Sequence, residues 1–330
     1  MLFDLELLIV TGKGGVGKTT VASALAWAAA DQGKRVLAVE LDATGDLHTA
    51  LIGPRPGTHQ PPRVGSQAGS QAPYKPVERQ PRLWSMSMDP EESLKEYLRT
   101  FLKIPVVTRI GALSGMFDFV ANAAPGVREI VTMGKVCYEV RERHYDIVIV
   151  DATATGHIVG QLDAPQAINE LVGAGLIRSQ TGWMQAILRN RARTGVVVVT
   201  TSEEMPVVET VELLHRLEER VDVGVATVVV NRVLPEPLAR ADLALFGEIK
   251  TNQSNQKALD RMVGGNSAAM RESIEFAVQQ RRNSEVHLTR LLEAIGTTPV
   301  AFVPWLSGAE PGPSSTGAVA ELLGEELGWS

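Results

Sequence analysis

The sequence lacks several features that whole classes of protein require. Its 330 residues include a single cysteine, Cys137, which excludes an intrachain disulfide and a metal site built from several cysteines. No apolar run reaches the roughly 18 residues of a transmembrane helix. The first residues lack the charged and apolar regions of a signal peptide, and we therefore expect a cytoplasmic protein with at most indirect membrane contact.

Neither sign of charge dominates the chain. The net charge is −6, and no block of like charges forms a tail. This balance argues against nucleic acid as a partner, because nucleic-acid-binding domains usually carry a basic surplus or stripe. A hydrophobic content of 44% and a charged content of 21% are typical of a globular protein, and the length allows one large domain.

The most informative stretch is near the start of the chain. Residues 7–10 form a short apolar run that predicts a buried strand, and residues 21–30 are strong helix formers. Between them, residues 12–19 read G-x-x-x-x-G-K-T, the phosphate-loop pattern, in the strand-to-helix context that it requires. Glycines allow such a loop to curl with its N–H groups pointing inward, because they carry no Cβ.

This loop predicts the phosphate-binding residues directly. Lys18 supplies a positive charge for the β- and γ-phosphates, and Thr19 supplies a hydroxyl for Mg²⁺. The N-terminus of the following helix adds the positive end of its dipole. The full predicted nucleotide-binding set of the loop is Gly12, Lys13, Gly14, Gly15, Val16, Gly17, Lys18, Thr19 and Thr20.

Three polar residues follow apolar strands further along the chain. Asp42 follows the run 35–41, Asp151 follows the run 146–150, and Asn231 ends the run 223–230. Ligands of open α/β sheets bind at the C-terminal ends of the strands. Asp42 can orient a water or approach Mg²⁺, or it can cap the turn that follows.

The other two residues of this kind have their own interpretations. Asp151 occupies the position of a Walker B aspartate, which holds Mg²⁺. The Asn231 amide can read adenine by donating and accepting hydrogen bonds, or it can belong to the turn before Pro235. His157 follows Asp151 closely, and for it a structural role and a catalytic role remain equally open.

The alternation of strands and helices predicts an α/β fold with a mostly parallel central sheet. We expect one domain over residues 1–330, with a helical subdomain formed by about 90–145 and 160–193. Methionines and aromatics in the first of these stretches either line a groove for an apolar protein partner or belong to the core. Residues 239–295 also read as mostly helical, and the Pro-, Gly-, Gln- and Ser-rich residues 54–81 read as a flexible loop.

Two motifs together resemble a known family. Lys13 inside the loop 12–19 gives the deviant phosphate loop of the dimeric nucleotide-switch ATPases. Residues 151–157 resemble the D-T-A-P-T-G-H signature of the arsenite-pump and tail-anchored-protein-targeting ATPases. Residues 124–129, 201–210 and 229–232 are similar to further segments of that family. The chain looks most like the bacterial, single-domain, actinobacterial-type members, with thin resemblance in 54–81 and 239–295.

The resemblance implies a three-layer P-loop NTPase that binds ATP and Mg²⁺ and acts as a homodimer or as a heterodimer with a related ATPase. By this resemblance Lys13 contacts the nucleotide of the facing subunit, Asp42 positions the attacking water, and Asn231 contacts adenine. The implied catalytic residues are Asp42, Lys13 and Lys18, and the implied metal-binding residues are Thr19, Asp42 and Asp151.

The sequence also departs from the family pattern. Residues 42–46 read D-A-T-G-D where the family's switch I usually reads D-P-A-H-S, and Ala152 and Ala154 replace Thr and Pro of switch II. These departures predict slow or differently regulated hydrolysis. A metalloid site requires several soft thiolates, so the single Cys137 argues against an arsenite pump. The paired cysteines that bind zinc in the eukaryotic targeting factor are also missing.

The sequence therefore supports an ATP-hydrolysing dimeric switch that couples its nucleotide state to the exposure of a surface for a client or partner, with membrane-protein targeting as one such role. A nucleotide-binding scaffold or chaperone subunit with little turnover is the first alternative, motivated by the altered switch I. A partitioning-type ATPase is the second alternative, and the short acidic C-terminus, residues 324–330, disfavours it.

Overall fold

The computed structural model of the chain describes residues 2–42, 44–52, 74–89, 92–93, 96, 127–171, 176–265, 267–308 and 312–329. An eight-stranded sheet forms its centre, with the strand order β3-β4-β2-β5-β1-β6-β7-β8. All neighbouring strands are parallel except the edge pair of β3 and β4, which is antiparallel. This arrangement confirms the predicted α/β fold with a mostly parallel sheet.

The strands and helices have the following bounds. The strands are β1 (Leu7–Gly12), β2 (Val36–Glu40), β3 (Val77–Gln80), β4 (Leu83–Ser87), β5 (Ile147–Ala154), β6 (Thr194–Thr201), β7 (Val225–Val233) and β8 (Val300–Pro304). The helices are η1 (Leu2–Asp4), α1 (Lys18–Asp31), α2 (Asp46–Ala50), α5 (Val127–Glu142), α6 (Thr155–Leu171), α7 (Leu176–Leu188), α8 (Glu204–Arg216), η3 (Leu217–Val221), α9 (Arg240–Thr251), α10 (Gln253–Met262), α11 (Ser267–Ile295) and α12 (Pro313–Leu327).

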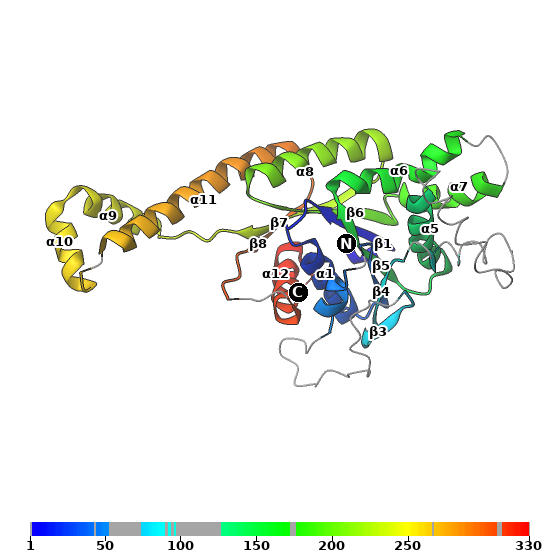
Figure 1. Cartoon of the computed structure of the whole chain (residues 1–330), viewed down its shortest axis with the longest axis horizontal. Coiled ribbons are helices and arrows are strands. Elements are labelled where there is room, and N and C mark those ends of the chain that lie inside the picture. Colours follow the sequence, from blue (N-terminus) through cyan, green and yellow to red (C-terminus); the bar gives the residue numbers. More distant parts are fainter. Residues whose placement is uncertain are drawn as a thin grey trace, which may run out of the picture.

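The sheet is covered on both faces, which explains why its central strands are continuous apolar runs. Successive side chains of a strand point to opposite faces. In β1, Leu7 and Ile9 join the core under α5, α6, α7 and α8, whereas Leu8 and Val10 join the core under α1, α2 and α12. All four side chains are fully buried. The result is a three-layer helix–sheet–helix body (Figure 1), as the sequence predicts.

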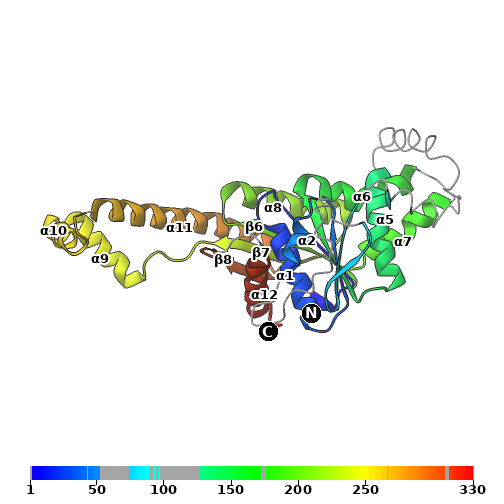
Figure 2. The same ribbon diagram turned by 60° about the horizontal axis from the view of Figure 1, so that its bottom comes forward.

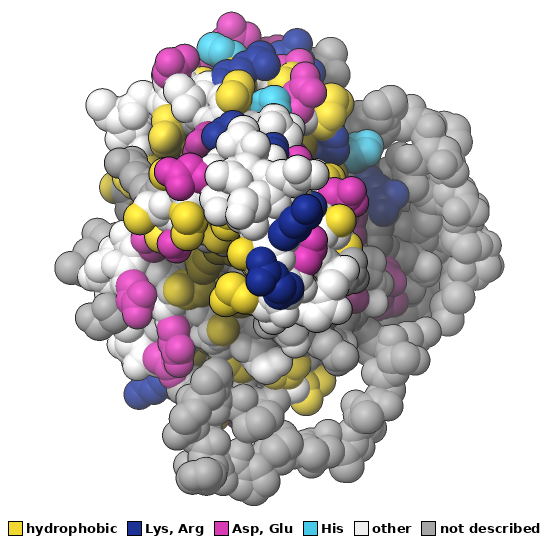
Figure 3. All heavy atoms as spheres, turned by 90° about the vertical axis from the view of Figure 1, so that its left-hand side faces the viewer, with side chains coloured by type: hydrophobic (Ala, Val, Ile, Leu, Met, Phe, Trp, Pro, Cys, Tyr) yellow, Lys and Arg dark blue, Asp and Glu magenta, His cyan; other side chains and the backbone are white. Residues whose placement is uncertain are grey.

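A helical arm, which we define as α9, α10 and α11, projects from this body (Figures 1 and 2). It leaves the sheet after β7, and α11 returns alongside α8 to reach β8. Most of the strongly exposed large apolar side chains of the described residues lie on the arm. They are Leu245, Met262, Met270, Phe276, Val286 and Leu292 on the three helices and Val263 in the turn after α10. Seen from the tip of the arm, hydrophobic side chains lie among charges of both signs (Figure 3).

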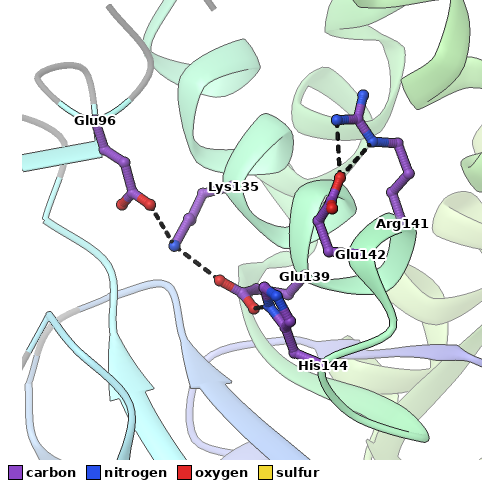
Figure 4. A network of polar contacts seen from close by, with 6 residues as sticks. All are labelled: Glu96, Lys135, Glu139, Arg141, Glu142 and His144. Carbon is purple, nitrogen blue, oxygen red and sulfur yellow. Dashed lines mark hydrogen bonds and ion pairs between the residues drawn. The ribbon is translucent and has the colours of Figure 1, made fainter. Parts of the chain in front are cut away.

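A partly buried lysine on α5 links segments that are distant in the sequence. Lys135 Nζ lies 2.8 Å from Oε1 of both Glu96 and Glu139, and Glu139 Oε2 lies 2.8 Å from His144 Nδ1 (Figure 4). Burial lowers the pKa of Lys135, but the hydrogen bonds to Glu139 and Glu96 outweigh it and raise the pKa above its ordinary value. Lys135 therefore stays charged and holds residue 96 against α5.

Several boundaries differ from the sequence prediction. Residues 77–80 of the predicted loop 54–81 form β3, which pairs with β4, while residues 54–73 lie outside the described part. Residues 155–157 form the first turn of α6, because Ile158 and other apolar residues of α6 pack into the core and favour a helix despite Gly156.

The predicted helical stretches are confirmed only in part. Two helices, α6 and α7, cover most of the predicted stretch 160–193, and Pro165 lies inside α6. Residues 97–126 of the predicted subdomain 90–145 lie outside the described residues, so the subdomain stays a prediction. The helices expected in 239–295 are present as the arm. No helix among the described residues has the length and apolar character needed to cross a membrane.

Candidate active site

The loop between β1 and α1 has a backbone that only glycine permits at two positions. A Cβ on Gly12 would lie 2.0 Å from the backbone oxygen of Val199 on β6. Gly17 has φ +95°, and a Cβ there would lie 2.4 Å from Asn231 Nδ2. The loop is therefore pressed against the neighbouring strands, and the glycines that the phosphate-loop pattern contains are required by its packing.

The inner side of the loop is anchored and its outer side is open. Val16 is buried in the core that α1 covers, and Lys18 Nζ donates a hydrogen bond to the Lys13 carbonyl at 3.3 Å. Gly14 and Gly15 are exposed, with no atom within 4 Å of the place that a Cβ would take. No side chain caps the N-terminus of α1, where Lys18, Thr19 and Thr20 form the first turn. This open cradle ends on a helix N-terminus, which suits an anion.

Thr19 and Asp151 meet beneath the cradle. Thr19 Oγ1 donates a hydrogen bond to Asp151 Oδ2 at 2.7 Å, and β5 carries Asp151 into register with Val10 of β1. The second carboxylate oxygen, Oδ1, is buried and has no hydrogen-bond partner among the described residues. Burial raises the pKa of Asp151 to about 7, against the opposing effects of the Thr19 hydroxyl and the Lys18 charge.

This pair has the donor chemistry that Mg²⁺ requires. A hydroxyl and a carboxylate with an unpartnered oxygen are hard oxygen ligands, and Mg²⁺ typically combines one or two carboxylates with phosphate oxygens and water. Among the described residues, no three His, Cys, Asp or Glu side chains gather into a metal-binding group. A cation at Thr19 and Asp151 would therefore share its coordination with a bound phosphate, and the residues present fit that role.

Asp42 lies at the same edge of the sheet. The backbone N–H of Leu41 donates to the backbone oxygen of Asp151 at 3.1 Å. Asp42 therefore lies directly after the last residue that pairs β2 with β5. Its side chain is exposed. Burial is the main cause of the raised pKa of Asp151, and the negative charge of Asp42 raises it further. The structure thus places Asp42 near the cradle in an exposed position. The turn that follows contains the short helix α2, which the sequence analysis did not predict.

Asn231 braces the phosphate loop from β7. Its Nδ2 donates to the Val16 carbonyl at 2.8 Å, and its Oδ1 accepts the Arg232 backbone N–H at 2.9 Å. One amide hydrogen and one lone pair of Oδ1 remain available for a ligand. Asn231 lies within β7, which continues to Val233, so the predicted strand end at this residue is two residues too early. The bonds to Val16 and Arg232 give Asn231 a structural role that the sequence analysis did not predict.

Lys13 is held by its own chain. Its Nζ lies 2.7 Å from Glu209 Oε1 on α8, and Thr155 Oγ1 donates to Glu209 Oε2 at 3.3 Å. Both side chains of the ion pair are 30% exposed, so solvent screens the pair and its strength is modest. Glu209 was not singled out from the sequence, because an acidic residue on a helix face gives no signal of its own.

The structure brings Lys13, Lys18, Thr19, Asp151 and Asn231 together at the C-terminal edge of the central strands. His157 is exposed in the first turn of α6, and among the described residues no hydrogen bond or ion pair ties its side chain to this edge. Glu40 is buried beside Asp42 and was missed as a candidate. A charged residue inside the otherwise apolar run 36–41 is the signal that could have identified it.

Comparison with known proteins gives a family match over most of the chain. The family described as "Anion-transporting ATPase" matches residues 5–184 and 173–264. The ATPase BagA of Mycobacterium tuberculosis is 30% identical over 263 residues, which cover 78% of this chain and 74% of that protein.

More distant relatives share shorter or weaker stretches. A putative arsenical pump-driving ATPase of Halobacterium salinarum is 26% identical over 267 residues, which cover 76% of this chain and 39% of that protein. The ATPase get3 of Schizosaccharomyces japonicus is 30% identical over 167 residues, which cover 51% of this chain and 46% of that protein.

Proposed function

The chain belongs to the anion-transporting ATPase family and is an ATPase, and on this premise we propose that it is a Mg²⁺-dependent dimeric switch that hydrolyses ATP to ADP and phosphate. The observation that carries the proposal is the hydrogen bond between Thr19 and the buried Asp151. It leaves one carboxylate oxygen without a partner directly beneath an open glycine cradle. The unpartnered oxygen gains a ligand when a metal–phosphate complex occupies the cradle.

Each predicted site residue has a role in this proposal. The loop N–H groups and the N-terminus of α1 bind the phosphates, and Lys18 pairs with the β- and γ-phosphates. Thr19 and Asp151 hold Mg²⁺, which when bound neutralises charge that develops on the phosphate oxygens. Asp42, exposed at the edge, orients the attacking water. Asn231 contacts adenine with its remaining amide hydrogen and lone pair while it braces Val16.

A second subunit completes the site in this proposal. Lys13 is paired with Glu209 within its own chain, and it must leave this pair to reach a nucleotide on a facing subunit. Because the pair is partly exposed, its loss costs at most about 1 kcal/mol, which a contact with phosphate offsets easily. The partner is a second copy of this chain or a related ATPase.

The surface that the switch controls suits an apolar protein better than a metalloid. Cys137 is fully buried, and burial raises the pKa of its thiol to about 12, so it offers no thiolate for arsenite. The exposed apolar side chains of the arm offer area for an apolar partner, and membrane-protein targeting in the cytoplasm is one role that this would serve.

Phosphate release measured on the purified full chain tests the proposal. The Lys18→Ala variant should lose ATP turnover by at least about 100-fold, because Lys18 acts on charge that develops in the transition state. Lys257→Ala, which removes an exposed lysine from α10 of the arm, is the matched control and should keep the wild-type rate. Normal turnover in Lys18→Ala would contradict the proposal, and no turnover in the wild type would leave only the scaffold alternative.

A further inference from the structure

Glu40 has the environment of a functional carboxylate, although neither the phosphate loop nor the Walker B position includes it. It is the last residue of β2, and only 2% of its surface is exposed. In the sheet its Cα is the register partner of Asp151 on β5. A carboxylate is buried to this extent only when hydrogen bonds replace its water, and all of the donors to Glu40 can be identified.

Four donors surround the Glu40 carboxylate, two for each oxygen. Oε1 accepts from Thr44 Oγ1 at 2.9 Å and from the Leu47 N–H at 3.3 Å. Oε2 accepts from the Gly45 N–H at 3.0 Å and from Ser87 Oγ on β4 at 2.8 Å. The Thr44 hydroxyl also lies 3.0 Å from Asp46 Oδ2, so its single proton serves either carboxylate.

Three of these four donors belong to the turn that follows Asp42. Residues 44–47 contain Gly45, with φ +84°, and the start of the short helix α2. α2 has only five residues, and no side chain at its N-cap position bonds to its first N–H groups. Glu40 reaches forward from the preceding strand and accepts hydrogen bonds from the N–H groups of Gly45 and Leu47, which fastens the turn to β2 and β4.

From this arrangement we propose that Glu40 is a positioning residue for the hydrolysis site: it fixes the turn after Asp42, and with it the direction in which Asp42 faces the nucleotide. The proposal rests on the proposed function for its consequence in catalysis, whereas the anchoring itself does not. Only a carboxylate satisfies the cluster fully, because an amide has one oxygen and would direct its NH₂ group at two of the donors.

The anchoring is tested by hydrogen exchange on the full chain without nucleotide. In Glu40→Ala the peptide that contains Gly45 and Leu47 should exchange at least about tenfold faster than in the wild type, because both N–H groups lose their acceptor. Glu40→Gln should show a smaller increase, since it keeps one acceptor oxygen. Thr49→Ala is the control, because this exposed hydroxyl lies in α2 and donates to the Gly45 carbonyl at 2.9 Å rather than to Glu40. Unchanged exchange in both Glu40 variants would overturn the proposal.

The consequence for catalysis is tested by separating ATP affinity from turnover. In Glu40→Ala and Glu40→Gln we expect kcat to fall by about 10- to 100-fold with Kd for ATP changed less than about threefold, since positioning affects the reacting geometry more than ground-state binding. Thr49→Ala should keep both values. If Glu40→Ala does not fold, as shown by its melting transition, Glu40→Gln and Thr44→Val give the answer, because each weakens the same cluster without emptying it.

The possible results separate the two proposals. A fall in kcat that accompanies an equal loss of ATP affinity would show a general structural role and overturn the positioning role. Wild-type kcat in the Glu40 variants would overturn it as well. A wild-type protein that does not hydrolyse ATP would contradict the proposed function, and the exchange measurement would still decide whether Glu40 anchors the turn.

Discussion

The body and the arm of this protein use apolar residues in opposite ways. In the body, β1 is packed from both sides, and Leu8 and Val10 are 0% exposed. In the arm, Phe276 and Val286 are 66% and 67% exposed, and α10 contains no buried residue. The difference shows that the sheet edge with the phosphate loop depends on a rigid core that is packed from both sides. The arm instead keeps apolar area exposed outside that core.

The largest expected effect is on the stability of these two regions. Leu8→Ala should lower the free energy of unfolding by about 2–5 kcal/mol, because it leaves a cavity between the sheet and α1. Phe276→Ala should change it by less than about 0.5 kcal/mol, because the ring is mostly in solvent already. Urea denaturation of the two variants measures both values. A large loss in Phe276→Ala would show that the arm has a core of its own.

Glycine substitutions provide a second contrast. Gly17→Ala forces a Cβ against Asn231 at positive φ, so it should destabilise the protein by about 1–3 kcal/mol and weaken ATP binding at least tenfold. Gly247→Ala in α9 has open space around it and should stabilise the arm by about 0.5–1 kcal/mol through helix propensity. Melting curves and calorimetric titration with ATP measure these effects. Equal effects at both sites would contradict the tight packing of the loop.

A pH titration compares the buried carboxyl of the body with an exposed one of the arm. The pKa of Asp151 rises from 3.8 in the unfolded chain to about 7 in the folded chain, mainly through burial. The raised pKa adds stability that is fully present below pH 3.8 and is lost as the pH rises through about 7. Without nucleotide, stability should therefore fall between about pH 4 and about pH 7, where the unfolded chain has lost this proton and the folded chain still holds it, and Asp151→Asn should remove that part of the slope. Asp242→Asn, at an exposed position of α9, is the control for the substitution itself.

The smallest expected effect concerns α8, which contacts both the phosphate loop and the arm. Glu209→Gln removes the partner of Lys13 and should lower stability by less than about 1 kcal/mol, because the pair is partly exposed. It should also strengthen ATP-dependent association by up to about fivefold, since Lys13 no longer has to leave a charged partner. Sedimentation with ATP measures association, and Glu212→Gln, which alters an exposed pair on the same helix, is the control. Weaker association in Glu209→Gln would contradict the proposal that Glu209 holds Lys13 only until the subunits associate.

The body could be predicted from the sequence because its signals are local. Apolar runs such as 147–150 leave no alternative to buried strands, and the glycine pattern of the phosphate loop fixes a turn between a strand and a helix. Parallel strands then bring Thr19 and Asp151 to one edge, although 132 positions separate them in the chain. The position of each strand end was less certain, as β7 shows by continuing past Asn231.

The remaining features depend on long-range contacts that no local pattern contains. The hydrogen bonds of Glu40 require β4 and the turn 44–47 to meet, and the pairing of Lys13 with Glu209 requires α8 to pass the phosphate loop. The amphipathic pattern of residues 239–295 predicts helices but gives no direction for them, so the projection of the arm was not predicted. The client surface that the sequence predicts in 90–145 and 160–193 stays a prediction.

The central claim, that ATP is hydrolysed at an edge completed by a second subunit, is tested most directly by mixing two inactive variants. Lys13→Ala lacks the residue given in trans, and Asp42→Asn lacks the residue used in cis. In a mixed dimer one site receives both residues, so an equimolar mixture should recover about a quarter of the wild-type rate of phosphate release. No recovery, with both variants folded and binding ATP, would contradict the claim.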